Sequence, residues 1–457
     1  MSEQSAEILG QELKARLENR DIRGVKQFFR SHEVADISEM LTVLPISDAL
    51  ALFKVMPRGR RAEVFAYLQL ERQEAFLEEL PQVITTAVVN EMEPDDRTKM
   101  LEELPFEIRN KILLTLSPEE RKIAWQLLSY PEDSVGRLMT TEIMELPASA
   151  RVGDVLERLR WARTIPEEQL NVLYVIDGDR RYIGDVSLPA LVTADPPTKR
   201  IDEVMTGKQA ALKATDEQSL AVDFFRKYDR SYLPVVDDDN VLLGIVTADD
   251  VFDVAEEEAT EDIHQFGGQS TLEESYFQTP LLTLFRKRAG WLALLFAGGT
   301  ITAATLRHYE GYAVSMAWLV FFLPLVVSAG GNTGSQTASL VIRGIAVKEM
   351  ELKDWYRVLG REFIVALGLG IVLAGMGYAR AVTWHLDPIV GAVIAASLVF
   401  VVMFGALVGG ALPFIFKRFN LDPAVSSSPL LAQLVDIIGA VIFYNTAYHF
   451  IMYWQHR

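Results

Sequence analysis

The segment PLLAQLVDIIGAVIFYNTAY, residues 429–448, is an apolar stretch long enough to cross a membrane, and it carries one carboxylate, Asp436, near its middle. An ionised aspartate at the centre of a membrane helix costs about 2.5–3.5 kcal/mol on insertion scales. No basic side chain of the apolar segments lies at a similar depth. Asp436 is therefore either protonated and hydrogen-bonded to a neighbouring helix, or ionised and facing water and a cation. We favour the cation site, because a proton relay needs several titratable groups in series and Glu362 is the only other intramembrane candidate.

Further apolar segments precede this one in the C-terminal part of the chain. The five segments lie near 288–308, 313–341, 360–383, 388–416 and 427–451. Each exceeds the roughly 20 residues that an α-helix needs to span a bilayer. The sequence therefore predicts an α-helical transmembrane domain of five spans. The alternative is a very hydrophobic soluble helical domain.

Basic residues are divided unevenly between the two ends of these segments. Three of them, Arg307, Arg380 and Arg457, fall on one face of the membrane. Ten fall on the other face: Arg286, Lys287, Arg288, Arg343, Lys348, Lys353, Arg357, Arg361, Lys417 and Arg418. Loops rich in Lys and Arg stay in the cytoplasm. We therefore expect a multi-pass protein of the cytoplasmic (inner) membrane, with its N-terminus in the cytoplasm and its C-terminus outside.

The second apolar segment contains polar and flexible residues in FFLPLVVSAGGNTGSQTASLVIRG, residues 321–344. Pro324, Gly330 and Gly331 predict an interrupted helix, and interrupted helices often line substrate sites in membrane proteins. Asn332 would then line or support the transport path. The alternative interpretation is a seam of small residues along which helices pack closely.

A single Asp436 per chain provides few ligands for a divalent ion. A homodimer whose twofold axis runs along a pore would supply two carboxylates, because a symmetric interface repeats every residue across the axis. Oxygen ligands suit hard cations, and Mg²⁺ keeps much of its water, so a sparse site suits it best. These residues favour Mg²⁺ passing through a homodimeric pore.

The N-terminal part of the chain has a different charge from the membrane part. Residues 1–275 contain 31 Lys and Arg against 54 Asp and Glu, whereas residues 276–457 contain 13 against 8. An acidic body of this kind attracts cations and repels nucleic acid, so we expect no nucleic-acid partner.

An internal repeat of twelve residues runs through residues 44–128. Leu or Met recurs without slippage at positions 44, 56, 68, 80, 92, 104, 116 and 128, and prolines follow many of these positions by one or two residues. Each unit predicts a short helix and a turn, and stacked units bury a common face. We therefore predict an α-helical solenoid over residues 1–132.

A second duplication occupies residues 133–254. VGRLMTTEIMELPAS (135–149) resembles IDEVMTGKQAALKAT (201–215), and LNVLYVIDGDRRYIGDVS (170–187) resembles RSYLPVVDDDNVLLGIVT (230–247), which aligns Gly184 with Gly244. Each half predicts strand, helix, strand, tight turn, strand and helix. The pattern resembles a tandem pair of CBS domains, an α+β regulatory module that often binds adenine nucleotides.

The resemblance to CBS domains implies a nucleotide site in the second half only. The ribose-binding pattern of that family, a Thr or Ser followed three residues later by Asp, is present as Thr247 and Asp250, whereas VSLPAL in the first half lacks the Asp. ATP or another adenine nucleotide is thus the expected ligand. The alternative for Asp250 is a helix cap, since Asp is common at such positions.

An acidic segment, TADDVFDVAEEEATEDIHQFGGQ (247–269), connects the two parts of the chain. Such a density of carboxylates usually marks a solvated helix face. Carboxylates three or four residues apart on a helix repel each other, and a bridging divalent ion would remove that repulsion. We expect an acidic connecting helix over 255–282, followed by the pore domain over 283–457.

The order of these parts is similar to that of the MgtE family of magnesium channels and transporters. The most specific strings are EEATEDIH (257–264), GGNTGSQTAS (330–339) and LDPAVSSSPLLAQLVD (421–436). The resemblance implies that Asp436 selects the ion and that Asp422 lies at the pore entrance. It also implies sensor carboxylates in the connecting helix (the family's plug), the CBS pair and the solenoid: Glu258, Glu261, Asp229, Asp250, Glu63 and Asp95. The sequence departs from the family at Ser428, where Gly is common, and at Ala432, where Thr is frequent.

The sequence thus predicts a Mg²⁺-selective channel or transporter gated by intracellular Mg²⁺. One alternative is a CBS-regulated transporter of another divalent cation such as Co²⁺ or Mn²⁺, and another is a membrane sensor that transports nothing. An enzyme is disfavoured, because the chain has no cysteine, only six scattered histidines, and neither a nucleophile–base pair nor a phosphate-binding Walker loop.

Overall fold

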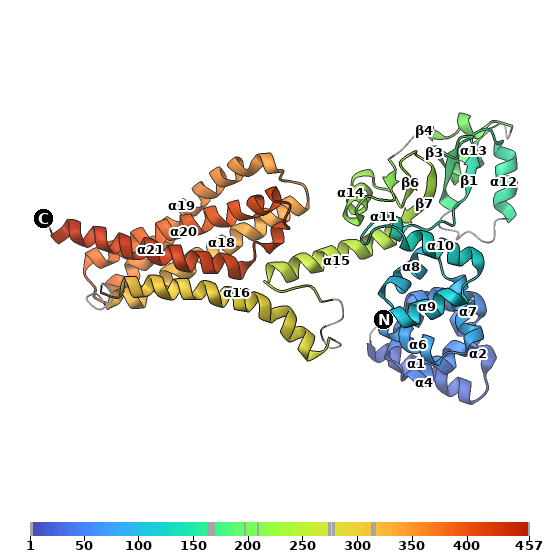
Figure 1. The fold of residues 1–457 in the computed structure, drawn as a ribbon, viewed down its shortest axis with the longest axis horizontal. Coiled ribbons are helices and arrows are strands. Elements are labelled where there is room, and N and C mark those ends of the chain that lie inside the picture. The colour runs from blue at the N-terminus through green and yellow to red at the C-terminus, as the bar shows by residue number, and fades with distance from the viewer. Residues whose placement is uncertain are drawn as a thin grey trace. The chain divides into compact units, whose positions relative to one another are not determined.

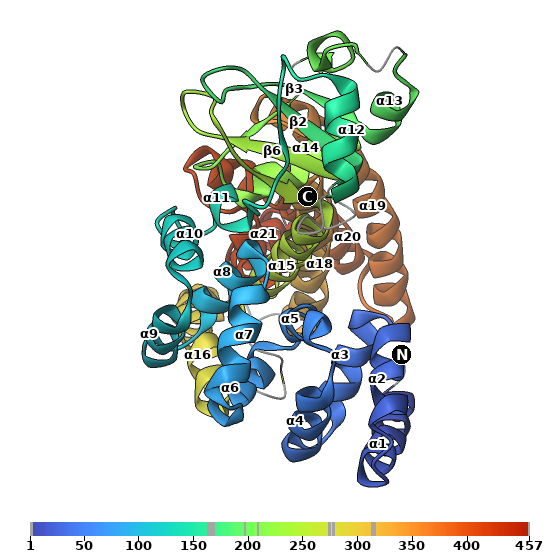
Figure 2. The ribbon, with the colours of Figure 1, turned by 90° about the vertical axis from the view of Figure 1, so that its right-hand side faces the viewer.

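The computed structural model describes the chain in two compact units, residues 1–256 and 257–457. The described residues are 3–161, 170–195, 198–207, 210–272, 276, 279–311 and 317–455. Figures 1 and 2 show the fold from two directions.

The N-terminal unit begins with ten helices that follow one another through short turns (Figure 2). They are α1 (Glu3–Glu18), α2 (Ile22–Ser31), α3 (Val34–Val43), α4 (Ile46–Val55), α5 (Arg58–Ala66), α6 (Leu70–Glu79), α7 (Gln82–Glu91), α8 (Pro94–Glu103), α9 (Phe106–Thr115) and α10 (Pro118–Leu128). The predicted helical N-terminal domain is confirmed.

The twelve-residue repeat explains the spacing of these helices. The repeated side chains from Leu44 to Leu116 are buried in one continuous core, and most of them directly follow the last residue of a helix. Pro45, Pro57 and Pro81 stand immediately before helices, where the missing N–H costs no hydrogen bond. Each repeat thus ends one helix with an apolar anchor and starts the next.

Two small sheets follow, one for each half of the predicted duplication. The first has the order β1-β2-β3-β4 and the second β5-β6-β7. In both sheets the first pair is parallel and the second antiparallel. Their elements are α11 (Val135–Leu138), β1 (Glu145–Pro147), α12 (Val152–Trp161), β2 (Val172–Ile176), β3 (Tyr182–Ser187), α13 (Leu188–Thr193), β4 (Thr206–Gly207), β5 (Leu212–Lys213), α14 (Gln218–Tyr228), β6 (Tyr232–Val236) and β7 (Leu242–Thr247). The CBS pair is confirmed.

The two halves exchange their edge segments. Thr140, which precedes the first sheet, pairs with Ile245 of β7 in the second sheet, while Thr206 of β4 pairs with Asp185 of β3. A Cβ atom at Gly184 would lie 2.3 Å from the carbonyl oxygen of Thr206, and one at Gly244 would lie 2.4 Å from that of Thr140. The aligned glycines therefore permit the same close backbone approach in both halves.

The acidic connector forms one helix, α15 (Ala248–Phe266). It starts in the N-terminal unit directly after β7 and ends in the C-terminal unit. The expected boundary between the CBS pair and the connecting helix, at residue 254, falls inside this helix. Gly268 follows it with a positive φ of 73°, a conformation that favours glycine.

The described part of the C-terminal unit contains five long apolar helices, as the sequence predicts (Figure 1). They are α16 (Leu281–His308), α18 (Trp318–Ala346), α19 (Trp355–Thr383), α20 (Pro388–Arg418) and α21 (Ser428–Gln455). Each is long and apolar enough to cross a membrane. Helices α18, α20 and α21 pack closely around a core that includes Phe322, Val401 and Phe443.

The predicted interruption of the second span is wrong. α18 continues through Pro324, Gly330 and Gly331 as a single α-helix. The glycines serve helix packing instead: a Cβ atom at Gly405 of α20 would lie 2.1 Å from the carbonyl oxygen of Gly330, and one at Gly409 would lie 2.2 Å from that of Gly334. The alternative interpretation, a seam of small residues, describes this segment.

Helix α16 is attached mainly to α21, and the two run in the same direction. Thr302 accepts a hydrogen bond from Gln433 Nε2 at 2.9 Å, and the Tyr309 hydroxyl accepts one from Asn445 Nδ2 at 2.9 Å. The rings of Tyr309 and Tyr444 also stack with centroids 4.8 Å apart. The starts of α16 and α21 therefore lie at the same end of the C-terminal unit.

Candidate functional site

Asp436 lies in the first half of α21, the helix that contacts α16, α18 and α20. Its neighbours in sequence fix the position of the helix: Val435 is fully buried beside Gly330, and Gly439 lies near Val327 and Val401. Asp436 itself is half-buried. Within the described chain, no hydrogen bond or ion pair joins its carboxylate to another residue. The structure thus shows neither the hydrogen bond to a neighbouring helix nor the basic partner that would hold this carboxylate within one subunit.

The polar residues of α18 separate into two faces. Asn332, Gln336 and Ser339 are exposed on one face of the single chain. Thr333 and Thr337 are buried on the other, where Thr337 donates a hydrogen bond of 2.8 Å to Glu362 of α19. Glu362, the second intramembrane carboxylate, is therefore used in packing α18 against α19. Asn332 is on the face that one chain leaves uncovered.

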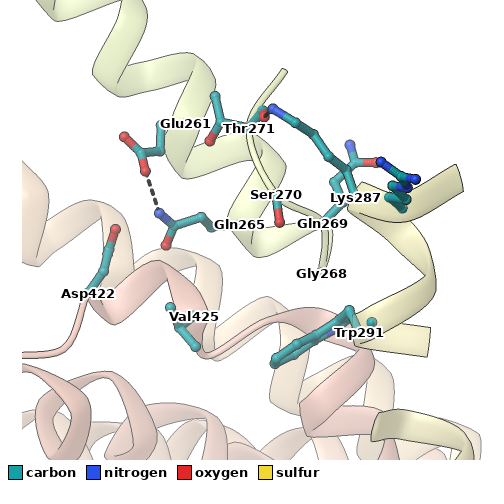
Figure 3. Close-up of a pocket in the computed structure, with 12 residues that line it drawn as sticks. Glu261, Gln265, Gly268, Gln269, Ser270, Thr271, Lys287, Trp291, Asp422 and Val425 are labelled. Carbon is teal, nitrogen blue, oxygen red and sulfur yellow. Dashed lines mark hydrogen bonds between the residues drawn. The ribbon is translucent and has the colours of Figure 1, made fainter. Parts of the chain in front are cut away.

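A cavity of about 490 Å³ lies between the end of α15, the first turns of α16 and the loop before α21 (Figure 3). Glu261 of α15 and Asp422, in the loop before α21, both line it. Asp422 accepts a hydrogen bond from the Ala424 amide at 2.8 Å, which starts the short turn Pro423–Val425. Burial, together with the charges of Asp422 and Glu261, raises the pKa of nearby Asp262 to about 6. The structure thus brings two predicted residues together and adds Asp262.

A second acidic cluster lies in the N-terminal unit, between the starts of α8 and α15. Asp95 is buried, its Oδ1 has no hydrogen-bond partner among the described residues, and burial and the charge of Asp250 raise its pKa well above the usual range. Burial raises the pKa of Asp250 to about 7, with Asp249 and Asp96 acting in the same direction against the hydrogen bond from Thr247. Thr247 Oγ1 donates this bond to Asp250 at 2.6 Å.

Comparisons with known proteins cover almost the whole chain. Residues 323–446 match the MgtE family, described as a divalent cation transporter, residues 32–133 match the MgtE intracellular N domain, and residues 201–257 match the CBS domain. The chain is 34% identical to the magnesium transporter MgtE of Thermus thermophilus over 96% of this chain and 98% of the relative. The chain belongs to the MgtE family.

A second relative and two solved structures agree with this assignment. The magnesium transporter MgtE of Bacillus subtilis is 32% identical over 92% of this chain and 95% of its own length. The cytosolic domain of the Mg²⁺ channel MgtE, solved in complex with ATP, is 30% identical with a TM-score of 0.50, and covers 54% of this chain and 99% of its own. The soluble part of a magnesium transporter is 25% identical with a TM-score of 0.52, covering 56% of this chain and 100% of its own.

Membership of the MgtE family establishes the class of protein. MgtE is a family of magnesium transporters, so the chain is a multi-pass membrane transporter and not an enzyme. The match to the CBS domain covers only the second half of the duplication. The sheet topology shows that the first half has the same fold, although it lacks the Thr-x-x-Asp pattern.

The structure leaves two of the predicted sensor residues, Glu63 and Asp229, apart from the two acidic clusters. Glu63 of α5 is exposed and accepts a hydrogen bond of 3.5 Å from Arg60. Asp229 is exposed at the end of α14, in a left-handed conformation with φ of 50°. Glu258 is exposed on α15, one turn before Glu261. Among the described residues of one MgtE chain, no group of three acidic or histidine side chains is arranged to hold a metal ion.

Ser428 and Ala432, where departures from the MgtE pattern are expected from the sequence, both lie at the contact between α18 and α21. Ser428 Oγ lies 2.9 Å from Ser335 Oγ, so the residue that replaces Gly adds a hydrogen bond between the start of α21 and the polar segment of α18. Ala432 faces Gly331, where a Cβ atom would lie 3.7 Å from the Ala432 Cα. A small residue at 432 suits this close approach of α18 and α21.

Sequence reasoning missed several carboxylates of the clusters. Burial and then the charge of Asp96 raise the pKa of Glu93 to about 7, and burial and then Asp249 raise that of Asp96 to about 6. Both residues belong to MEPDDR, which the sequence marks as a helix start. Because Asp and Glu are common in the first turn of any helix, that signal alone does not distinguish them from ordinary capping residues.

Proposed function

We propose that this MgtE chain forms a homodimeric, Mg²⁺-selective channel of the cytoplasmic membrane, which intracellular Mg²⁺ closes. The observation that carries the proposal is the half-buried Asp436, which has no partner in the described part of its own chain and lies on a membrane helix of a magnesium transporter. A twofold axis beside α21 would place two such carboxylates opposite each other. Together they would hold a Mg²⁺ ion through its water shell.

The proposed pore also includes the uncovered polar face of α18 and the loop before α21. Asn332 would offer its amide oxygen to the water shell of the ion, and Asp422 would concentrate cations at the cytoplasmic mouth. The excess of Lys and Arg beside the starts of α16 and α19 supports a cytoplasmic position for this mouth, with the C-terminus outside.

The proposed gate uses one helix that belongs to both acidic clusters. α15 carries Asp250 near its start and Glu261 near its end. The separation of these two residues is about 16 Å along the helix axis. Mg²⁺ bound by Asp95 and Asp250, and by Glu258, Glu261 and Asp422, would remove repulsion that otherwise separates these elements. Glu63 and Asp229 would complete sites contributed by two subunits. Shifting the ratio of closed to open molecules from 1:99 to 99:1 requires about 5.5 kcal/mol of binding free energy, which several weak sites can share.

Adenine nucleotide binding at the CBS pair is the second part of the proposal. A solved MgtE cytosolic domain contains ATP, and Thr247 and Asp250 supply a hydroxyl and a carboxylate for the ribose. The matched control is Ser187, which occupies the corresponding position in the first half, at the end of β3. Thr247→Ala should weaken ATP binding to the full-length chain, measured by calorimetry, whereas Ser187→Ala should not. Equal affinities for both variants would remove this assignment.

Mg²⁺ uptake by vesicles containing the purified chain tests the pore. Asp436→Asn keeps the size of the side chain and removes its charge, so uptake should fall by about 100-fold, the loss expected for an ion that needs a desolvated carboxylate. Glu349→Gln, which removes an exposed carboxylate from the loop after α18, should leave uptake unchanged. A panel with Co²⁺ and Mn²⁺ determines the ion preference. Normal Mg²⁺ uptake by Asp436→Asn, with the protein inserted, would eliminate Asp436 as the selecting residue.

A further inference from the structure

The cavity of about 490 Å³ has walls of opposite charge. Glu261 and Asp422 line one side, and Lys287 and Trp291 of α16 lie on the other (Figure 3). Arg286, the residue before Lys287, also lines the cavity. A volume of this size is within the range of small-molecule sites, which is roughly 300–1,000 Å³. The cavity therefore has room for a ligand in addition to water.

Arg286 is one cation of the cavity lining that the carboxylates of the cavity do not neutralise. Arg286 is exposed and forms no ion pair with any described residue, although two carboxylates line the same cavity. Lys287 Nζ donates a hydrogen bond of 2.5 Å to the Thr271 carbonyl oxygen, which holds the loop after α15 against α16. This hydrogen bond positions Lys287 beside the loop. A ligand that carries both charges would contact Arg286 and Lys287 at one end and the two carboxylates at the other.

The start of α16 has the composition of a membrane–water interface. Leu281, Leu282 and Phe285 are 85%, 60% and 67% exposed, and the three basic residues Arg286–Arg288 follow them directly. Trp291 lies one turn further into the span. Exposed apolar side chains beside basic residues and a tryptophan are typical of helices at the level of lipid headgroups. From this composition we expect the cavity to lie at the level of the phospholipid phosphates.

We propose that this cavity binds the phosphoethanolamine headgroup of a membrane lipid, with its phosphate at Arg286 and Lys287 and its ammonium at Glu261 and Asp422. The proposal rests on the membrane location shared by the MgtE family, and it does not need Asp436 to select the ion. It uses two carboxylates of the proposed gate, so lipid binding is measured in the absence of Mg²⁺. Arg286 would supply charge-assisted hydrogen bonds to the phosphate oxygens. The ammonium would donate N–H groups to the two carboxylates.

Headgroup chemistry distinguishes this lipid from others. Phosphatidylglycerol carries a phosphate without a cation, so Glu261 and Asp422 would repel it. Phosphatidylcholine carries a quaternary ammonium with no N–H to donate, so it leaves both carboxylates without a hydrogen bond. A primary ammonium beside a phosphate is the combination that suits both walls.

Lipid binding to the purified full-length chain, measured by native mass spectrometry in EDTA, tests the proposal. Phosphatidylethanolamine should bind more tightly than phosphatidylglycerol or phosphatidylcholine. Arg286→Gln should weaken its binding about tenfold, the value of one charge-assisted hydrogen bond. Arg288→Gln is the matched control, since Arg288 has the same charge two residues away and does not line the cavity, and it should bind like the wild type. Glu261→Gln should reduce the preference for phosphatidylethanolamine over phosphatidylglycerol.

Two results would overturn the site. Equal losses in Arg286→Gln and Arg288→Gln would indicate general attraction to a basic surface, and the absence of any headgroup preference would exclude recognition of a zwitterion. Soluble phosphoethanolamine distinguishes the source: weaker binding than the lipid assigns the cavity to the membrane, and equal binding assigns it to a soluble ligand of the same chemistry. Asp436→Asn should bind the lipid normally, so failure of the pore assignment and failure of this site are separable.

Discussion

The carboxyl group of Asp95 is buried beside Asp250, so ionising both costs free energy in the folded chain. Burial raises the pKa of Asp250 to about 7 and that of Asp96 to about 6, whereas an unfolded aspartate titrates near about 3.9. The folded cluster therefore keeps protons that the unfolded chain releases. Its contribution to stability is complete below about pH 4 and is lost as the pH rises through about 6 to 7.

Mg²⁺ should compete with protons for this cluster. In Mg²⁺-free buffer, the thermal unfolding midpoint of the full-length chain should fall as the pH is raised from about 5.5 to 8, and Mg²⁺ should restore it at the higher pH. Below about pH 6, more Mg²⁺ should be needed for half of this effect as the pH falls. The required concentration should increase about tenfold for each unit of pH decrease and each proton that Mg²⁺ displaces. Circular dichroism at several pH values and Mg²⁺ concentrations measures both effects.

Asp95→Asn should reduce the pH dependence and the stabilisation by Mg²⁺, because it removes the buried charge and keeps the size of the side chain. Glu107→Gln changes the net charge by the same amount at an exposed position of α9. If the two variants behave alike, the formal net charge of −18 would explain the pH dependence without a specific site.

At the scale of secondary-structure elements, the crossing of α18 and α20 depends on glycine. A methyl group at Gly405 would approach the Gly330 carbonyl oxygen to 2.1 Å, so the two helices would have to move apart. Gly405→Ala should destabilise the C-terminal unit by about 1–3 kcal/mol. Gly375→Ala on α19 is the matched control, because nothing lies within 4 Å of its added methyl group, and the alanine should be neutral or stabilising. Thermal unfolding in detergent measures both, and equal midpoints would contradict a tight α18–α20 contact.

The glycines of α18 also show where prediction from sequence ends. Glycine and proline in an apolar segment predict either a break in the helix or a close helix contact, and the choice depends on Gly405 and Gly409, more than 70 residues away in the chain. Periodic signals were easier to interpret: the twelve-residue repeat, the duplicated CBS pattern and the five apolar segments all predict elements that the structure contains. Their information lies within each segment, so it does not depend on which segments meet.

The acidic clusters could be predicted only in part from the sequence. The resemblance to MgtE predicts Asp95 and Asp250 as site residues. Only the structure shows that Glu93, Asp96 and Asp262 also have raised pKa values. A carboxylate in a helical first turn is common in any sequence. Its raised pKa depends on burial and on charges from distant segments, and neither is visible in the local pattern.

At the scale of the whole molecule, the acidic N-terminal part and the basic membrane part are joined through α15. This single helix begins beside the Asp95 cluster and ends at the cavity that contains Asp422. A continuous helix transmits a displacement along its axis, since its backbone hydrogen bonds resist local extension. In the proposed gate, cations bound near the two ends of α15 would act on the same helix, which is the physical basis of the proposal.

Mg²⁺ should protect this helix from proteolysis. Phe252 is 73% exposed on α15, and Phe266 is its last residue, so chymotrypsin can cut at both ends when the helix separates from its neighbours. Millimolar Mg²⁺ should slow cleavage between 247 and 269, and potassium chloride at equal ionic strength should not, because screening alone cannot bridge carboxylates. A Glu258→Gln, Glu261→Gln double variant should lose most of the protection, whereas Glu107→Gln should keep it. Equal cleavage rates with and without Mg²⁺ in the wild type would show that cation binding does not change the helix, and the gating proposal would then fail even if Asp436 selects the ion.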